Sequence, residues 1–204
     1  MKINQFKFYH NYHIIILCCF LSFSFLLIAD EKESHKSNYM GEINRLIKSL
    51  SAKDIEDLTL GNGMGLAKAA ELNGYPGPKH VLEMQEQLFL EKEQLTSINQ
   101  IFEKMKSQAK SQGQILISLE KELNDYFSNT TITNDNLEKT LKKIAEAKSN
   151  LRYIHLSAHI KTTEILSNNQ IKKYNQLRGY ADNPCEKIPD GHNKEMWMLH
   201  NECN

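Results

Sequence analysis

Two long stripes of apolar residues, each repeating every three or four positions, constrain the fold of this chain more than any other feature. One stripe runs through residues 91–127 and the other through 134–164. Side chains spaced by three and four lie on one face of an α-helix, so each stripe predicts a long amphipathic helix. The polar residues 128–133 predict a turn near Asn129, with Thr133 capping the second helix. The sequence therefore predicts a long antiparallel helical hairpin.

Each of the two predicted helices has a single apolar face. The stripe residues are Ile98, Ile101, Phe102, Met105, Ala109, Leu116, Leu119, Leu123, Tyr126 and Phe127 in the first helix, and Leu137, Leu141, Ile144, Leu151, Ile154, Ala158 and Ile165 in the second. The first stripe thins over residues 107–114, where Gly113 costs about 1 kcal/mol relative to Ala. A hairpin with one stripe per helix either gains a partner chain or leaves a groove partly open, and a homodimer is the simplest way to bury its apolar surface.

Shorter helices are predicted on both sides of the hairpin. A helix is expected over 42–50, and Ser51 is a suitable N-cap for another. Residues 78–89 should also be helical. Ser167, with Gln170 three residues later, has the spacing of a capping box for a last helix. Because no segment alternates with period two for long enough to form a strand, the predicted fold class is all-α.

Residues 61–84, GNGMGLAKAAELNGYPGPKHVLEM, predict a bent connection between helices. Three glycines loosen the backbone before a short Ala-rich helical turn, which Asn73 and Gly74 then end because both tolerate positive φ. The following Tyr-Pro-Gly-Pro sequence makes a rigid corner, and Pro78 is well placed to begin the next helix. This segment, named the elbow below, should fix how its neighbouring helices meet.

Residues 1–29 have the pattern of a signal peptide. Lys2 and Lys7 give a basic start, an apolar run covers 14–29 apart from two serines, and a cut is expected after Ala29. The alternative is an uncleaved anchor, although the run is shorter than the ~20 residues that span a bilayer. The rest of the chain divides into a flexible lead, a helical domain and a tail. These cover 30–40, 41–180 and 181–204, and all are expected to be extracytoplasmic, or held at the membrane by an uncleaved anchor.

Charge and motifs exclude several classes of function. The chain has 25 Lys and Arg residues against 25 Asp and Glu, and no basic patch indicates a nucleic-acid partner. No Ser/His/Asp or Cys/His arrangement and no pair of carboxylates indicates catalysis. The glycines at 61–65 follow no strand, so a nucleotide-binding loop is not supported. We therefore expect a binding protein with no organic cofactor, and not an enzyme.

The elbow and two five-residue motifs resemble the Spy/CpxP family of periplasmic proteins. The family signature is a repeated Leu-Thr-x-x-Gln. Here LEKEQ occupies 90–94 and LSNNQ occupies 166–170, with Glu and Ser in place of Thr. The chain is most similar to the branch described as periplasmic heavy-metal sensors or metal-resistance proteins. The resemblance implies an antiparallel dimer shaped like a shallow cradle.

His155 and His159 are the sharpest candidates for metal ligands. Residues at i and i+4 project from one helix face, about 5–6 Å apart at Cβ, so two imidazoles could share one Zn, Cu, Ni or Co ion. Further ligands would come from His80, from a carboxylate such as Glu83 or Glu164, or from the tail. In the alternative interpretation, both histidines are polar residues that flank the apolar stripe.

The tail contains a second group of candidate ligands. They are Cys185, His192, His200 and Cys203, with methionines nearby, in a stretch whose prolines and glycine predict a loop. Alternatively, the two cysteines form a disulfide, as is common outside the cytosol. The methionines at 64, 84 and 105 are expected to fill the core.

Taken with the resemblance, these features predict a periplasmic protein that captures or senses divalent transition metal ions in the envelope metal-stress response. The alternative is an ATP-independent chaperone that holds unfolded proteins on an amphiphilic helical surface. A third interpretation is an adaptor that binds a membrane signalling partner through its dimer groove. The expected partners are therefore a second copy of the chain together with either such a signalling protein or unfolded protein clients.

Overall fold

The computed structural model describes residues 36–182, 184–201 and 203. Contacts divide the chain into two units, Met1–Gly41 and Glu42–Asn204. The elements are η1 (Met40–Glu42), α2 (Ala52–Leu60), α3 (Lys68–Glu71), α4 (Pro78–Glu83), α5 (Lys92–Ser128), α6 (Asn134–Ile165), α7 (Asn168–Leu177) and α8 (Lys194–His200). The described part contains no strand, so the predicted all-α class is confirmed. The predicted signal peptide at 1–29 lies outside the described residues.

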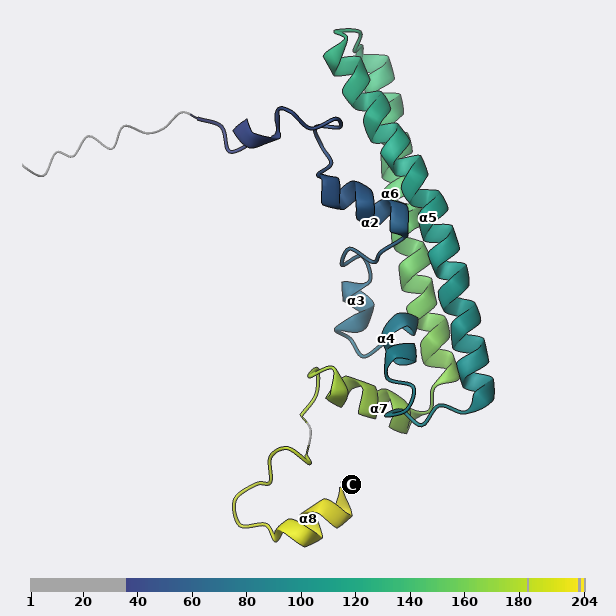
Figure 1. Ribbon diagram of the computed structural model, residues 1–204, viewed down its shortest axis with the longest axis vertical. Coiled ribbons are helices and arrows are strands. Elements are labelled where there is room, and N and C mark those ends of the chain that lie inside the picture. The colour runs from purple at the N-terminus through teal and green to yellow at the C-terminus, as the bar shows by residue number, and fades with distance from the viewer. Residues whose placement is uncertain (1–35, 183, 202, 204) are drawn as a thin grey trace, which may run out of the picture. The chain divides into compact units, whose positions relative to one another are not determined.

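The two longest helices, α5 and α6, pack side by side in antiparallel directions, as predicted (Figure 1). Their interface with α2 forms one apolar core. Its buried members are Leu58, Ala109, Leu116, Ile144, Ala147 and Leu151. Leu141, which we expected in the stripe, is 46% exposed, whereas its neighbour Thr140 is 1% exposed. The hydroxyl residue thus occupies the buried face at this turn, and apolar spacing alone could not reveal it.

Gly113 explains why the first stripe thins in the middle of α5. A Cβ atom placed on Gly113 would lie 2.2 Å from the carbonyl oxygen of Leu58. The backbone of α2 therefore approaches α5 where α5 has no side chain. At its other end, α2 is capped as predicted. The Ser51 hydroxyl accepts a hydrogen bond from the Asp54 N–H, and the Asp54 carboxylate accepts one from the Ser51 N–H.

A second core joins α4, α5 and α7 at the other end of the hairpin. Its buried residues are Val81, Leu88, Ile98, Leu166 and Tyr174. The glutamines that end the two five-residue motifs meet beside it, since the side-chain amides of Gln94 and Gln170 lie 2.9 Å apart. Gln170 also acts in the predicted capping box with Ser167. The motifs therefore connect the beginning of α5 to the beginning of α7.

Three local predictions were wrong. Residues 43–50 form turns and bends, because Ser49 donates to Glu120 on α5 and Ile47 is buried, which holds the segment in an irregular path. Helix α4 ends at Glu83, and the turns that follow lead to Phe89, whose positive φ of 49° is incompatible with a continuous helix. The tail, expected to be a loop, contains α8, whose start is capped by the Asn193 side chain.

No helix among the described residues is both long enough and apolar enough to cross a membrane.

Candidate functional site

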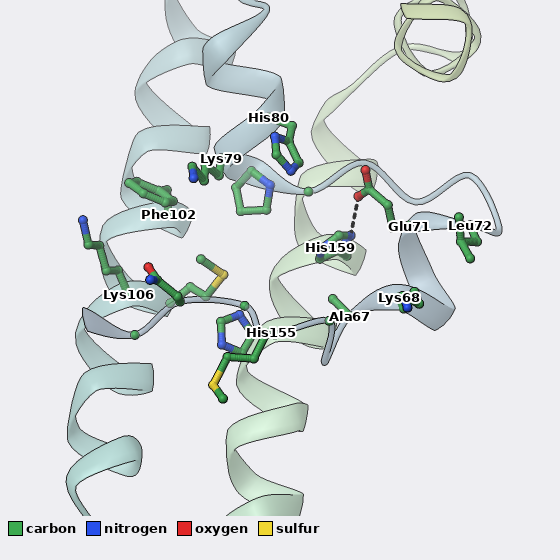
Figure 2. Close-up of a pocket in the computed structure, with 18 of the residues that line it drawn as sticks. Ala67, Lys68, Glu71, Leu72, Lys79, His80, Phe102, Lys106, His155 and His159 are labelled. Carbon is green, nitrogen blue, oxygen red and sulfur yellow. Dashed lines mark ion pairs between the residues drawn. The ribbon is translucent and has the colours of Figure 1, made fainter. Parts of the chain in front are cut away.

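A pocket of about 550 Å³ lies where the elbow meets the hairpin (Figure 2). Its walls come from the glycine-rich loop at 61–67, from α3 and the beginning of α4, from the first half of α5, from α6 and from the residues after α7. The elbow brings these elements together because Gly74 adopts a φ of 80° and Pro78 begins α4. Three predicted ligands, His80, His155 and His159, line this one pocket.

His155 is the most unusual polar residue of the pocket. Its side chain projects from α6 and is 3% exposed, yet its Nε2 atom has no hydrogen-bond partner. A buried polar atom without a partner costs about 1–3 kcal/mol, so such atoms commonly mark a functional role. Burial lowers the pKa of His155, and the neighbouring His159 lowers it further. Its imidazole is therefore neutral near pH 7 and carries a lone pair that can bind a metal ion.

His159 follows one turn later on α6 and is held in a defined tautomer. Its Nδ1 lies 2.8 Å from the carbonyl oxygen of Tyr75. A carbonyl only accepts hydrogen bonds, so Nδ1 carries the hydrogen and Nε2 of the neutral ring carries the lone pair. Metal-binding histidines are commonly oriented in this way by a backbone carbonyl. Both His155 and His159 could thus present a lone pair to a shared ligand.

Glu71 anchors the wall of the pocket opposite α6. Its Oε1 accepts hydrogen bonds from the hydroxyl of Tyr174 at 2.7 Å, from Nε of Arg178 at 3.1 Å and from the hydroxyl of Tyr180 at 3.2 Å. Its Oε2 lies 3.7 Å from Nδ1 of His159. Burial and the Glu71 carboxylate both raise the pKa of Tyr174, which therefore stays protonated and donates. These bonds tie α3 to the end of α7 and fix the corner beside His159.

His80 lines the pocket but is already paired. Its Nδ1 lies 2.8 Å from Oε2 of Glu83, one turn along α4. Among the residues that the structure describes, no three His, Cys, Asp or Glu side chains are grouped closely enough to hold a metal ion. His155 and His159 therefore form a pair of candidate ligands, and a complete coordination shell would need donors of another kind or a movement of His80.

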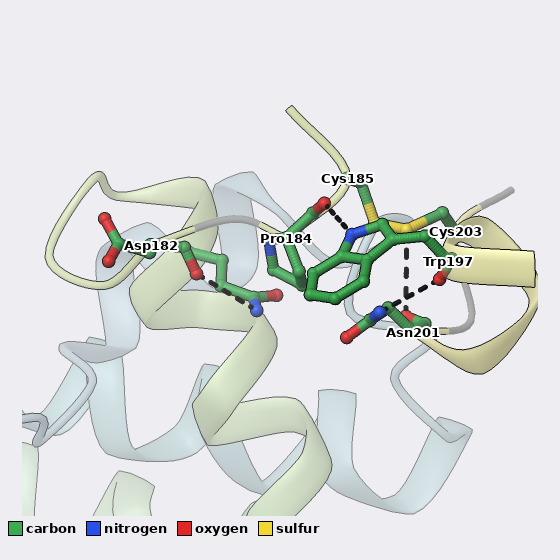
Figure 3. The surroundings of a disulfide bond; sticks show 7 residues. Asp182, Pro184, Cys185, Trp197, Asn201 and Cys203 are labelled. Atoms are coloured by element: carbon green, nitrogen blue, oxygen red, sulfur yellow. Dashed lines mark hydrogen bonds between the residues drawn. A yellow bond between two sulfur atoms is a disulfide. The ribbon is translucent and has the colours of Figure 1, made fainter. Parts of the chain in front are cut away.

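The tail residues are held in a different arrangement (Figure 3). Cys185 and Cys203 form a disulfide, so in this form neither offers a thiolate to a metal. Trp197 donates from Nε1 to the carbonyl oxygen of Pro184 at 2.8 Å, and the ring of His192 packs edge-on against its indole. None of these tail residues lines the pocket, and neither does His200, which lies in the last turn of α8.

Sequence reasoning missed two groups of pocket residues. Met64 was expected in the core but is 41% exposed and lines the pocket together with Met105. Its position between two glycines of the elbow was the available signal. The anchoring role of Glu71 and the residues after α7 had no distinct signal in sequence, because their contacts join positions more than 100 residues apart.

Comparisons with protein-family models, with curated proteins and with solved structures found no match to this chain.

Proposed function

We propose that this protein is a metal-binding protein of the exported, Spy/CpxP-like kind, which captures or senses a transition metal ion through His155 and His159. The observation that carries the proposal is the buried Nε2 of His155, which has no partner and belongs to a residue lining a pocket that His159 also lines. The role is binding and not turnover.

The chemistry of the two imidazoles supports this proposal. Both rings come from consecutive turns of one rigid helix. Binding a shared ion would therefore not require the fold or a loop to rearrange. Neutral imidazole suits Zn, Cu, Ni and Co ions, and the lowered pKa of His155 means that no proton has to be removed first. His80 could join as a third ligand if it left Glu83.

The disulfide in the tail is consistent with an oxidising compartment, which fits the expected periplasmic location. A homodimer that covers the remaining hairpin surface, and a membrane signalling partner that reads its metal-bound state, complete this proposal.

Metal titration of the purified protein by calorimetry tests the proposed function. His155→Ala and His159→Ala should each weaken Zn²⁺ binding at least tenfold, or ~1.4 kcal/mol, and the affinity should fall at acid pH because protonated imidazole cannot bind. His200→Ala, outside the pocket, is the matched control and should bind as the wild type does. Equal affinity of the wild type and the double His155/His159 variant would contradict the proposal.

A second candidate, the chaperone, is favoured by one observation. Large apolar side chains are exposed along the hairpin, namely Ile115, Phe127, Leu141, Tyr153 and Ile160. Such side chains could hold unfolded segments weakly. A chaperone acting through this surface should suppress aggregation of a denatured client equally with and without metal, and after truncation at Tyr180. A wild-type protein that does not suppress aggregation of the client would exclude the chaperone function.

A further inference from the structure

We propose that the thioethers of Met64 and Met105 complete the metal site and that its preferred ion is soft and monovalent, of the Cu(I) or Ag(I) class. This inference rests on the proposed function of His155 and His159. Two imidazoles alone do not complete the coordination shell of a metal ion, and no third His, Cys, Asp or Glu side chain of the described residues joins them.

The donor atoms of the pocket are predominantly soft or borderline. Two thioethers and three imidazoles line it, and Glu71 is the one carboxylate among its described lining residues. Oε1 of Glu71 already accepts three hydrogen bonds, and Oε2 faces the ring of His159. Hard ions select carboxylate oxygen, whereas thioether sulfur selects Cu(I) and related ions. The available donors therefore favour a soft ion.

The charge of the pocket lining also favours a monovalent ion over a divalent one. Four cationic side chains line the pocket: Arg178 pairs with Glu71 and Lys79 pairs with Glu83, while Lys68 and Lys106 add further positive charge. The Coulomb energy of a bound ion in the field of these cations scales with its charge, so a divalent ion is repelled about twice as strongly as a monovalent one at the same point. Neutral ligands and a positive surrounding therefore penalise an ion of charge +1 less than a divalent ion.

The backbone at Met64 is specialised. Its φ is 46°, in the left-handed region that non-glycine residues seldom adopt, and it lies between Gly63 and Gly65. Met64 is also 41% exposed, so its side chain does not fill the core. Met105 lies on α5, one turn beyond Phe102, and also lines the pocket. The elbow and the hairpin thus each contribute one sulfur atom to the same pocket.

The test uses Ag⁺ as a probe, because it has the softness of Cu(I) and does not change oxidation state under ordinary conditions. In wild-type protein labelled with ¹³C at the methionine methyl groups, one equivalent of Ag⁺ should shift the resonances of Met64 and Met105. The resonance of Met84, which packs against the core of α4, α5 and α7, should stay in place. Methyl resonances of Met64 and Met105 that do not move at one equivalent would overturn the inference, and this measurement needs no variant to fold.

Variants then separate this inference from the proposed function. The double variant Met64→Leu with Met105→Leu should bind Ag⁺ at least tenfold more weakly and should weaken Zn²⁺ binding much less than Ag⁺ binding, while Met84→Leu should change neither. Wild-type Ag⁺ affinity in the double variant, with Zn²⁺ binding still lost in His155→Ala, would overturn the thioether ligands and leave the histidine site standing. Failure of the wild type to bind either ion would overturn both.

Discussion

Gly77 and His159 are in such close contact that a Cβ atom on Gly77 would lie 2.8 Å from Cε1 and 2.9 Å from Nε2 of the His159 ring. The corner of the elbow therefore packs directly against the Cε1 and Nε2 atoms of the imidazole. Nδ1 of the same ring is held by the carbonyl oxygen of Tyr75. The elbow thus fixes both the tautomer and the position of His159.

Gly77→Ala should therefore weaken Zn²⁺ binding at least tenfold with little loss of helical structure, because the new methyl group would displace the ring. Calorimetry gives the affinity, and circular dichroism checks the fold. Gly63→Ala is the matched control, since it alters the same pocket at a position where a Cβ atom meets nothing within 4 Å. An unchanged affinity in Gly77→Ala would show that the position of His159 does not control binding.

Gly113→Ala should destabilise the protein, although Ala is the better helix former by about 1 kcal/mol. The added methyl group would lie 2.2 Å from the backbone oxygen of Leu58, and no change of side-chain rotamer can relieve that overlap. Overpacking of this kind costs about 1–3 kcal/mol. Urea denaturation measures the effect, with Ser111→Ala on an exposed face of α5 as the control. A Gly113→Ala protein more stable than the wild type would contradict the close crossing of α2 and α5.

Leu151→Ala should lower the free energy of unfolding by about 2–5 kcal/mol, because Leu151 is fully buried between α5 and α6. Leu119 is only partly buried at the same core, so Leu119→Ala should cost less than Leu151→Ala. Chemical denaturation of both variants gives the order. The opposite order, or no effect of Leu151→Ala, would mean that the register of the hairpin is wrong.

The cap of α2 should make stability depend on pH in the acid range. Hydrogen bonds from Ser51, with its side chain the largest contributor, lower the pKa of Asp54 in the folded protein. A lowered folded-state pKa stabilises the protein above the unfolded value of about 3.9, and this contribution is lost as pH falls through the folded value. As the pH falls below about 4, the melting temperature of the Asp54→Asn variant should therefore drop less than that of the wild type. Melting temperatures that fall equally with pH in the two proteins would rule out this contribution of Asp54 to stability.

Local rules predicted the hairpin well because they act within a few residues. The caps at Ser51, Thr133 and Ser167 all formed, since each depends on a hydroxyl and a residue three positions later. The failures required long-range contacts. The segment before α2 is irregular because Ser49 reaches Glu120, and the turns after α4 are held by Gln170, whose side-chain amide donates to the carbonyl oxygen of Leu88.

The site was predictable only in part, for the same reason. Spacing placed His155 and His159 on one face of α6, and the structure brings His80 to the same pocket. That His155 is buried without a partner, and that Met64 leaves the core for the pocket, depends on how the elbow folds across the hairpin. No local pattern carries that information.

The ring ¹⁵N resonances of His155 and His159 report whether their two imidazoles bind one metal ion. Ring nitrogens can be assigned in two-dimensional spectra of the apo protein, where His159 should appear protonated at Nδ1. On adding one equivalent of Zn²⁺, the Nε2 resonances of both residues should shift together, while those of His192 and His200 stay unchanged. Ring nitrogen resonances of His155 and His159 that stay unchanged while the protein binds Zn²⁺ would contradict a metal ion shared by these two imidazoles.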